Sequence, residues 1–248
     1  MDTTTQPLEI LNHGPIDCAC VIYGDVYPWI YVDKLYNMLS RNISAGVRFH
    51  VYTEAHRIVP SHYIKHELTD WKIGGPKKAW WYKMQLFNSA HHAGPLLYFD
   101  LDTVVVNNID WLWRLPLNYF WTIRDFKYLW RPTHYGINSS VMWWDTVKYH
   151  HVWETFSKQR LDTVMRRHRG DQDFLTQTIN KNQYRFFQAD QVKSWRWQAL
   201  DGGYDFSKKQ YQKPGAGTYV DERTSILVFH GEPKPDQVSD SHIEHFWK

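Results

Sequence analysis

Hydrophobic and polar positions divide the chain into short apolar runs and segments of helical periodicity. Residues 18–23 form an apolar, partly β-branched run that ends before Gly24 and Asp25, which predicts a buried strand followed by a loop. Residues 28–38 carry apolar side chains at helical spacing and predict an amphipathic helix. The same reasoning predicts strands over 47–53, 96–99, 119–123, 141–144, 184–187 and 225–229, a helix over 80–87, and loops at 74–76 and 202–217.

Strands that alternate with helices in this way predict an α/β fold with a mostly parallel, Rossmann-like sheet flanked by helices. The length of 248 residues suits a single domain that spans 1–248, and no linker, internal repeat or low-complexity tract interrupts it. In sheets of this kind, ligands bind at the carboxyl ends of the strands. Polar residues that follow the predicted strands are therefore the first candidates for a functional site.

The net charge and the lack of targeting signals exclude some classes of protein. Lys and Arg number 29 against 26 Asp and Glu, a net charge of +3, which is too small for a dedicated nucleic-acid binder. The amino terminus lacks the form of a signal peptide, and no apolar run approaches the length of about 18 residues that a membrane span requires. We therefore expect a cytoplasmic protein without a transmembrane segment. The basic cluster at 166–169 leaves weak peripheral attachment to the inner face of a membrane open, although a solvated helix face is the simpler interpretation.

Cysteine usage agrees with this expectation. Cys18 and Cys20 lie two residues apart, so in a strand both point to the same face and are too constrained to form a disulfide with each other. We expect buried, reduced thiols, as in a reducing compartment.

Two carboxylates, Asp100 and Asp102, follow the strand expected at 96–99. The bare pattern is not informative, because it recurs at Asp171 and Asp173. The apolar residues on both sides are informative, since burying two like charges together is costly unless a cation compensates. A divalent ion that bridges a diphosphate would compensate them, and an exposed turn is the alternative.

A second candidate group follows the strand expected at 225–229. His230 comes directly after it, Gly231 allows a close turn, and Lys234 lies four residues beyond His230. An imidazole can complete a metal site begun by two carboxylates, and an ammonium can neutralise phosphate oxygens. A single histidine in a chain with 14 is more often structural, but its neighbours favour a functional role.

Four short motifs occur in the order seen in glycosyltransferase family 8 and its bacterial relatives. They are Tyr98-Phe-Asp-Leu-Asp102, Gly136-Ile-Asn-Ser139, Gly170-Asp-Gln-Asp173 and His230-Gly-x-x-Lys-Pro235. Over about residues 18–236 the chain thus resembles these retaining enzymes of the GT-A fold. The resemblance implies transfer of a sugar from a nucleotide diphosphate donor, with UDP as the expected nucleotide, to a carbohydrate or lipid-linked glycan acceptor, as in polysaccharide biosynthesis.

The resemblance also implies a role for each matching residue. Asp100, Asp102 and His230 would bind Mn²⁺, with Mg²⁺ as the alternative ion. The other implied site residues are Lys83 and Lys234 on the donor, Asn138 and Ser139 at the sugar pocket, Asp171 on the sugar hydroxyls, Gln172 near the anomeric carbon, and Tyr23 and Gly24 beside the base.

Two departures from the family pattern concern the acceptor side. The last motif continues as Lys234-Pro-Asp236 where the family often has Trp, and residues 124–135 match no family pattern. Because Gln172 is an amide and a poor nucleophile, we expect front-face attack by the acceptor hydroxyl with retention of configuration. Three alternatives remain open: an inverting enzyme with Asp171 or Asp173 as base, a non-catalytic sugar or nucleotide binder, and a metal-dependent phosphohydrolase.

Overall fold

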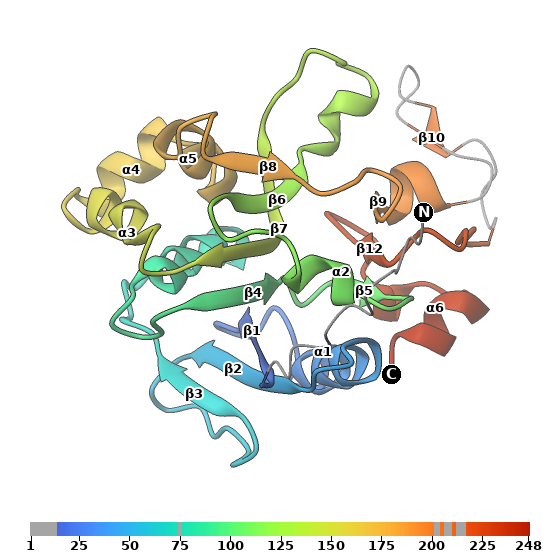
Figure 1. Cartoon of the computed structure of the whole chain (residues 1–248), viewed down its shortest axis with the longest axis horizontal. Coiled ribbons are helices and arrows are strands. Elements are labelled where there is room, and N and C mark those ends of the chain that lie inside the picture. The colour runs from blue at the N-terminus through green and yellow to red at the C-terminus, as the bar shows by residue number, and fades with distance from the viewer. Residues whose placement is uncertain (1–13, 74–75, 201–203, 206–209, 212–216) are drawn as a thin grey trace, which may run out of the picture.

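The structure is a computed structural model that describes residues 14–73, 76–200, 204–205, 210–211 and 217–248. Its centre is a seven-stranded sheet in the order β3-β2-β1-β4-β7-β6-β8 (Figure 1). The strands are β1 (Ile16–Val21), β2 (Val47–Thr53), β3 (Ile64–Glu67), β4 (Pro95–Phe99), β6 (Phe120–Arg124), β7 (Ile137–Asp145) and β8 (Tyr184–Phe186).

One strand of this sheet, β7, runs against the others. It pairs antiparallel with both β4 and β6, whereas the remaining pairs are parallel. The sheet is therefore mostly parallel, and the predicted α/β class is confirmed. Because β7 is reversed, its first residues lie at the edge where the neighbouring strands end.

Helices cover both faces of the sheet. On one face, α1 (Ile30–Asn42) buries Tyr31, Val32, Leu35, Met38 and Leu39, which recur at the spacing of a single helix face. Burial of large apolar side chains of this kind stabilises the fold by roughly 1.5–3 kcal/mol each. The other face carries η1 (Pro76–Phe87), α3 (His150–Ser157), α4 (Leu161–Arg167) and α5 (Asp171–Thr178). The remaining helices are short: α2 (Asp110–Trp113), η2 (Phe126–Leu129), η3 (Trp195–Ala199), η4 (Pro235–Gln237) and α6 (Ser241–Phe246).

A second, three-stranded sheet has the order β5-β12-β9, formed by β5 (Thr103–Val105), β12 (Ile226–Val228) and β9 (Val192–Ser194). We predicted the strand at 225–229 as one more strand of the main fold, and the structure places it in this separate sheet. The pairing of Val228 with Thr103 brings the residues that flank these two strands together. Asp102, which precedes β5, and His230, which follows β12, therefore become neighbours.

Most predicted elements are confirmed with small shifts, and two differ. The helix expected at 80–87 is η1, a 3₁₀ helix that begins at Pro76. The region 202–217, predicted as a long loop, contains an antiparallel pair of two-residue strands, β10 (Tyr204–Asp205) and β11 (Gln210–Tyr211). Residues 202–203, 206–209 and 212–216 of that region, and Gly74 and Gly75, lie outside the described residues.

Cys18 and Cys20 are free thiols, both fully buried in the core beneath α1, as predicted. Within the described ranges no helix combines the length and apolar character that a bilayer crossing demands. The assignment of residues 1–248 to one domain stays a prediction.

Candidate active site

A cleft of about 860 Å³ lies at the carboxyl edge of the main sheet. The ends of β1 and β4, the start of β7 and the start of α5 all contribute to its wall. Reversal of β7 explains how residues around Gly136 reach the same edge as Asp100, whose backbone N–H donates to the Ser140 carbonyl at 2.7 Å. The cleft collects Lys83, Asp100, Asp102, Asp171, Gln172, His230 and Lys234 from the sequence-predicted site.

Asp100 follows β4 and is held by two donors. The ammonium of Lys83 lies 2.6 Å from Asp100 Oδ1, and the Tyr98 hydroxyl donates to the same oxygen at 2.6 Å. The Lys83 side chain extends from η1 and is buried. Asp100 is thus held in place by one side chain from η1 and one from β4.

Asp102 lies two residues further on and is paired with a different lysine. Lys234 Nζ lies 2.5 Å from Asp102 Oδ2, and the Tyr27 hydroxyl donates to this oxygen at 2.9 Å. Burial and the neighbouring Asp100 raise the pKa of Asp102, and Lys234 opposes that rise. The cleft therefore contains two adjacent carboxylates, each neutralised by one ammonium.

Asp171 forms the third carboxylate of the cleft, at the first residue of α5. The Ser139 hydroxyl donates to Asp171 Oδ2, and Lys83 Nζ lies 3.6 Å from the same oxygen. Burial raises the pKa of Asp171, which Lys83 and Ser139 partly offset. Burial alone would lower the pKa of Lys83, but Asp100 and Asp171 outweigh it, so the pKa of Lys83 is raised and the side chain stays charged.

His230 lines the same cleft but is oriented by its own neighbours. Its Nε2 lies 2.7 Å from Ser194 Oγ, and its ring stacks on Phe126 with centroids 5.3 Å apart. Burial, followed by the charge of Arg196, lowers the pKa of His230 to about 3. The imidazole is therefore neutral near pH 7 and keeps a lone pair that a metal ion could use.

The donor set fits a divalent cation in its chemistry. Asp100 and Asp102 already bind cationic groups, and His230 is a neutral imidazole. The three do not offer ligand atoms within 4.8 Å of one another; among the described residues only Asp17, His50 and His92, elsewhere on the sheet, meet that condition. Asp100, Asp102 and His230 can therefore bind one ion together only if a side chain moves. In the structure, the ammoniums of Lys83 and Lys234 occupy the position of a cation beside the two carboxylates.

The other predicted residues divide into those on the cleft wall and those behind it. Gln172, in the first turn of α5, and Tyr23, after β1, line the cleft. Asn138 and Ser139 are buried behind the wall, where Ser139 positions Lys83 and Asp171, and Ser140 lines the cleft instead. Gly24 also lies off the wall, with its N–H donating to Glu54 Oε1 at 2.6 Å.

Tyr23 belongs to an aromatic stack at the rim of the cleft. Its ring lies 3.8 Å from that of Tyr82, and Tyr82 stacks on Trp71 at 5.4 Å. The Tyr23 hydroxyl donates to Asp70 Oδ1 at 2.7 Å. The phenol ring beside the cleft is therefore held in place on its face and at its hydroxyl.

The segment after β6, which matched no pattern in the sequence, forms part of the cleft wall. Asp125 accepts hydrogen bonds from Lys127 Nζ at 2.8 Å and pairs with His134 Nε2 at 2.9 Å. All three residues line the cleft. Figure 1 shows this segment extending from the sheet as a loop that includes η2. Sequence reasoning missed these residues and also missed Tyr27, whose contact with Asp102 spans 75 positions of the chain.

Comparison with known proteins identifies the fold. No protein-family model matches the sequence, and no curated protein is similar to it by sequence. The structure is similar to the glycosyltransferase GlyE of Streptococcus pneumoniae TIGR4, with a TM-score of 0.63 and 16% identity over 94% of this chain and 60% of GlyE. It is similar to an active-site mutant of LgtC, with a TM-score of 0.59 and 14% identity over 93% of this chain and 94% of LgtC.

The bifunctional glycosyltransferase WbbM is also similar, with a TM-score of 0.57 and 11% identity over 96% of this chain and 49% of WbbM. The chain thus spans less than two thirds of GlyE and WbbM but nearly all of LgtC. At these identities the comparisons show the fold. The seven-stranded sheet with its reversed strand β7 and its helices on both faces is a GT-A glycosyltransferase fold.

Proposed function

We propose that this protein is a metal-dependent glycosyltransferase that moves a sugar from a nucleotide diphosphate donor to a carbohydrate or lipid-linked glycan acceptor with retention of configuration. The observation that carries the proposal is the pair of lysine-neutralised carboxylates, Asp100 and Asp102, in the cleft of a GT-A fold. A diphosphate bound with a divalent cation matches such a site, because the cation satisfies the carboxylates and frees an ammonium for phosphate oxygens.

Asp100 and Asp102, with His230 as third ligand, would hold the ion. Carboxylate and imidazole ligands suit Mn²⁺ better than Mg²⁺, which prefers oxygen and its own water. When bound, the ion supplies positive charge that stabilises the departing diphosphate. Lys234, beside Asp102, is placed to contribute further charge to the same leaving group.

Lys83 and Asp171 act together beside Asp100. Lys83 joins Asp100 to Asp171, so the position of each carboxylate depends on the same ammonium. Asp171 can accept hydrogen bonds from sugar hydroxyls, and Gln172, the next residue, presents an amide to the cleft. Tyr23 at the rim offers an aromatic surface for the base of the nucleotide, for which UDP is the proposed identity.

The neighbours support this assignment through what their structures contain. One LgtC structure is a galactosyltransferase in complex with donor and acceptor sugar analogues, and another carries a glutamine-to-glutamate substitution in its active site. Gln172 is the glutamine that the described residues place in the cleft of this chain. An amide there favours front-face attack, since it orients the sugar but is a poor covalent partner.

The test combines binding with turnover. Purified protein is heated with UDP, GDP and UDP-sugars, each with and without Mn²⁺, and release of free nucleotide diphosphate is followed in parallel. We expect one nucleotide class to raise the melting temperature only with metal, by an amount that grows with the logarithm of ligand concentration. Asp102→Asn should abolish the part of the rise in melting temperature that depends on the metal.

Binding without any turnover across a panel of acceptors would favour a non-catalytic sugar-nucleotide binder. Turnover of simple phosphate esters instead of nucleotide sugars would favour a phosphohydrolase.

A further inference from the structure

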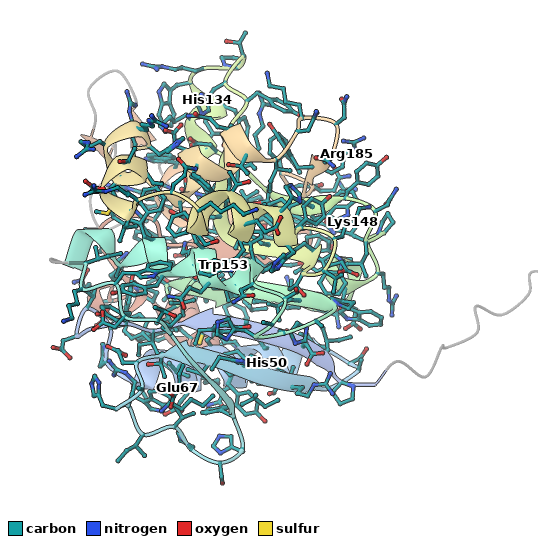
Figure 2. All side chains as sticks on the ribbon, turned by 90° about the vertical axis from the view of Figure 1, so that its left-hand side faces the viewer. His50, Glu67, His134, Lys148, Trp153 and Arg185 are labelled. Atoms are coloured by element: carbon teal, nitrogen blue, oxygen red, sulfur yellow. The ribbon has the colours of Figure 1, made fainter. Side chains whose placement is uncertain are left out.

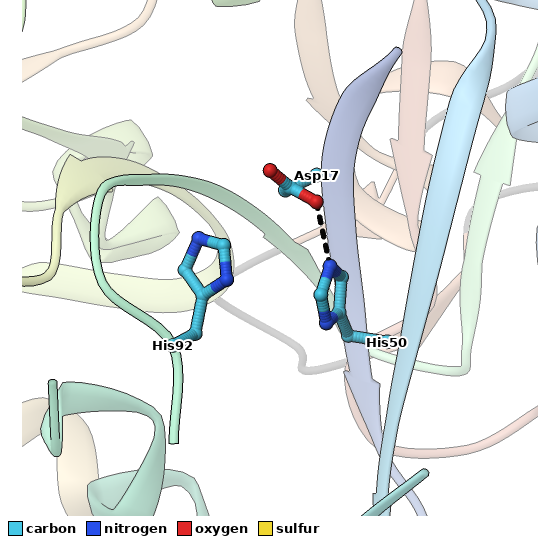
Figure 3. Close-up of side chains that lie close together, drawn as sticks. All are labelled: Asp17, His50 and His92. Atoms are coloured by element: carbon cyan, nitrogen blue, oxygen red, sulfur yellow. Dashed lines mark hydrogen bonds and ion pairs between the residues drawn. The ribbon is translucent and has the colours of Figure 1, made fainter. Parts of the chain in front are cut away.

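A second group of metal-ligating side chains lies away from the cleft, on the face of the sheet that η1 covers. We define the histidine cluster as Asp17 on β1, His50 on β2, His66 on β3 and His92 in the turn before β4. Figure 3 shows Asp17, His50 and His92 converging from these separate segments. The ligand atoms of these three residues all lie within 4.8 Å of one another.

The cluster is separate from the cleft. Cys18 pairs with Leu97 across the sheet, which puts Asp17 level with Leu96, four residues before Asp100. At the rise of a strand, that separation is about 13 Å. Figure 2 likewise shows His50 well removed from His134, which lines the cleft.

We infer that Asp17, His50 and His92 form a binding site for a transition-metal ion of the Zn²⁺ type. The ligands of a tetrahedral Zn²⁺ site lie about 2.1 Å from the ion and therefore about 3.4 Å from one another. The three ligand atoms lie within 4.8 Å of one another, so the ion requires the side chains to adjust, and Arg48, which donates to both oxygens of Asp17, must release one of them. Two imidazoles and one carboxylate suit Zn²⁺, Co²⁺ or Ni²⁺ and do not suit Ca²⁺ or Mg²⁺, which prefer oxygen.

The second hydrogen bond of each imidazole supports this inference. His92 Nε2 lies 3.0 Å from the Pro95 carbonyl, to which it can only donate, so Nδ1 of the same ring keeps its lone pair. His50 Nδ1 lies 2.8 Å from His66 Nε2, which fixes one side of the ring. His50 Nε2 lies 2.6 Å from Asp17 Oδ1, a contact that requires a proton between the two atoms, and Nε2 becomes the ligand atom when the ion replaces that proton. Metal-binding histidines in proteins show this arrangement, with one nitrogen on the ion and the other on a fixed partner.

Protonation states in the cluster also suit a cation. Burial raises the pKa of Asp17, but His50 and Arg48 outweigh it, and its pKa lies well below the usual range. Burial and the neighbouring His50 lower the pKa of His66 to about 4, so His66 is a neutral ring near pH 7 whose Nε2 pairs with His50 Nδ1. Burial lowers the pKa of His92 as well. A carboxylate and neutral imidazoles are the forms that bind metal.

The ion would join β1, β2 and the turn that leads into β4. Asp17 and His92 are partly exposed, which leaves a route for the ion and for a water as fourth ligand. Because β4 delivers Asp100 to the cleft at its other end, the site would brace the strand on which the carboxylates depend. The inference uses no part of the proposed transfer chemistry.

The test is Zn²⁺ binding to the chelator-treated, full-length protein, measured by competition with a chromophoric chelator. We expect one site that survives Asp102→Asn and His56→Ala, the latter changing an exposed histidine outside the cluster. His92→Ala and Asp17→Asn should each weaken binding at least about 10-fold, and His66→Ala should weaken it about 10- to 100-fold by removing an outer partner. Circular dichroism checks that each variant is folded.

Two further readouts decide the assignment. Co²⁺ should give visible absorption bands that His92→Ala weakens and Asp102→Asn leaves intact, and at equal concentration Zn²⁺ should raise the melting temperature of His92→Ala less than that of the wild-type protein. Unchanged Zn²⁺ affinity in folded His92→Ala and Asp17→Asn would overturn the inference. The cluster would then be a hydrogen-bonded network only.

Discussion

Lys234 Nζ lies 2.5 Å from Asp102 Oδ2, although 132 residues separate the two in the chain. The pairing of β12 with β5 brings them together, because Asp102 precedes one strand and Lys234 follows the other. The ammonium thus rests on a carboxylate that the proposed function assigns to the metal ion. Metal and lysine should compete for Asp102.

Replacement of Lys234 tests this competition. Lys234→Met should strengthen Mn²⁺ binding in the absence of nucleotide by about 5-fold, since an ion pair whose ammonium is partly exposed contributes about 1 kcal/mol. With donor present, the same variant should raise KM and lower kcat, because the lost charge acts on the diphosphate as it departs. Titration calorimetry with Mn²⁺ and steady-state kinetics measure the two effects. An unchanged kcat/KM would place Lys234 outside the active site.

Metal dependence is tested by chelation and by one isosteric change. Transfer should vanish in excess chelator and return best with Mn²⁺, and Asp102→Asn should lower kcat/KM by at least about 100-fold, as loss of a charged ligand does. Asp102→Asn should remain folded, since functional sites normally cost stability and do not supply it. Asp162→Asn, on the exposed surface of α4, is the matched control. Full activity in chelator would contradict the proposal.

Lys83 should matter for stability as well as for turnover. It is buried and neutralises both Asp100 and Asp171, so Lys83→Met leaves the buried carboxylate of Asp171 and the partly buried one of Asp100 without their cation. We expect a loss of about 3–5 kcal/mol in the free energy of unfolding, measured with urea. Lys127→Met, at an exposed lysine in the same cleft, should change it by less than about 1 kcal/mol.

A double variant tests the cause of that loss. Lys83→Met combined with Asp171→Asn should recover part of the stability, because one of the unpaired carboxylates is gone. If Lys83→Met unfolds with the wild-type free energy, the network is not a stabilising one.

The pH dependence of stability should include a contribution from Glu54, which follows β2 beside the cleft rim. Burial raises the pKa of Glu54, but hydrogen bonds from Arg57 and from the N–H of Gly24 outweigh it and lower the pKa to about 2. Relative to an unfolded value near 4.5, this contribution is complete above pH 4.5 and is lost as the pH falls toward 2. Glu54→Gln should therefore lower the free energy of unfolding at pH 7 by about 1–3 kcal/mol and flatten its fall between about pH 4.5 and 2. Equal slopes in the two proteins would contradict this assignment.

The sequence predicted the elements better than the contacts between them. The strand expected at 47–53 matches β2, because alternation in a buried strand is a local signal. The helix expected at 80–87 is present in η1, but its 3₁₀ type was not predicted, since Trp81 to Phe87 are buried on every side and their periodicity cannot separate an α-helix from a 3₁₀ helix.

Site residues that lie within one sequence motif were likewise easier to predict than residues that reach the site from distant parts of the chain. Asp100 and Asp102 were predicted from the strand before them, and they lie in the cleft. Tyr27 carries no local signal for its contact with Asp102. Asn138 is buried behind the cleft wall, where its side-chain oxygen accepts from the Ser140 N–H at 3.0 Å, and its sequence position alone does not show this. The Asp17–His50–His92 group was missed for the same reason, since its members come from three separate segments that only the sheet unites.

The last prediction concerns the stereochemistry of transfer, which depends on Gln172 at the start of α5. Its amide can orient the sugar and steady positive charge through its carbonyl dipole, but it makes a poor covalent partner. Gln172→Ala should therefore slow transfer by about 10- to 1000-fold, as loss of one electrostatic contact does. Gln177→Ala, on the exposed side of the same helix, should leave the rate unchanged. Gln172→Glu introduces a nucleophile, and intact-mass spectrometry would reveal any glycosyl-enzyme that it accumulates. Proton NMR of the first product from an α-linked donor decides between the mechanisms, because the anomeric coupling constant reports the configuration directly. Retention agrees with front-face attack, whereas an inverted product would assign the role of base to Asp171 or Asp173 and replace this mechanism with an inverting one.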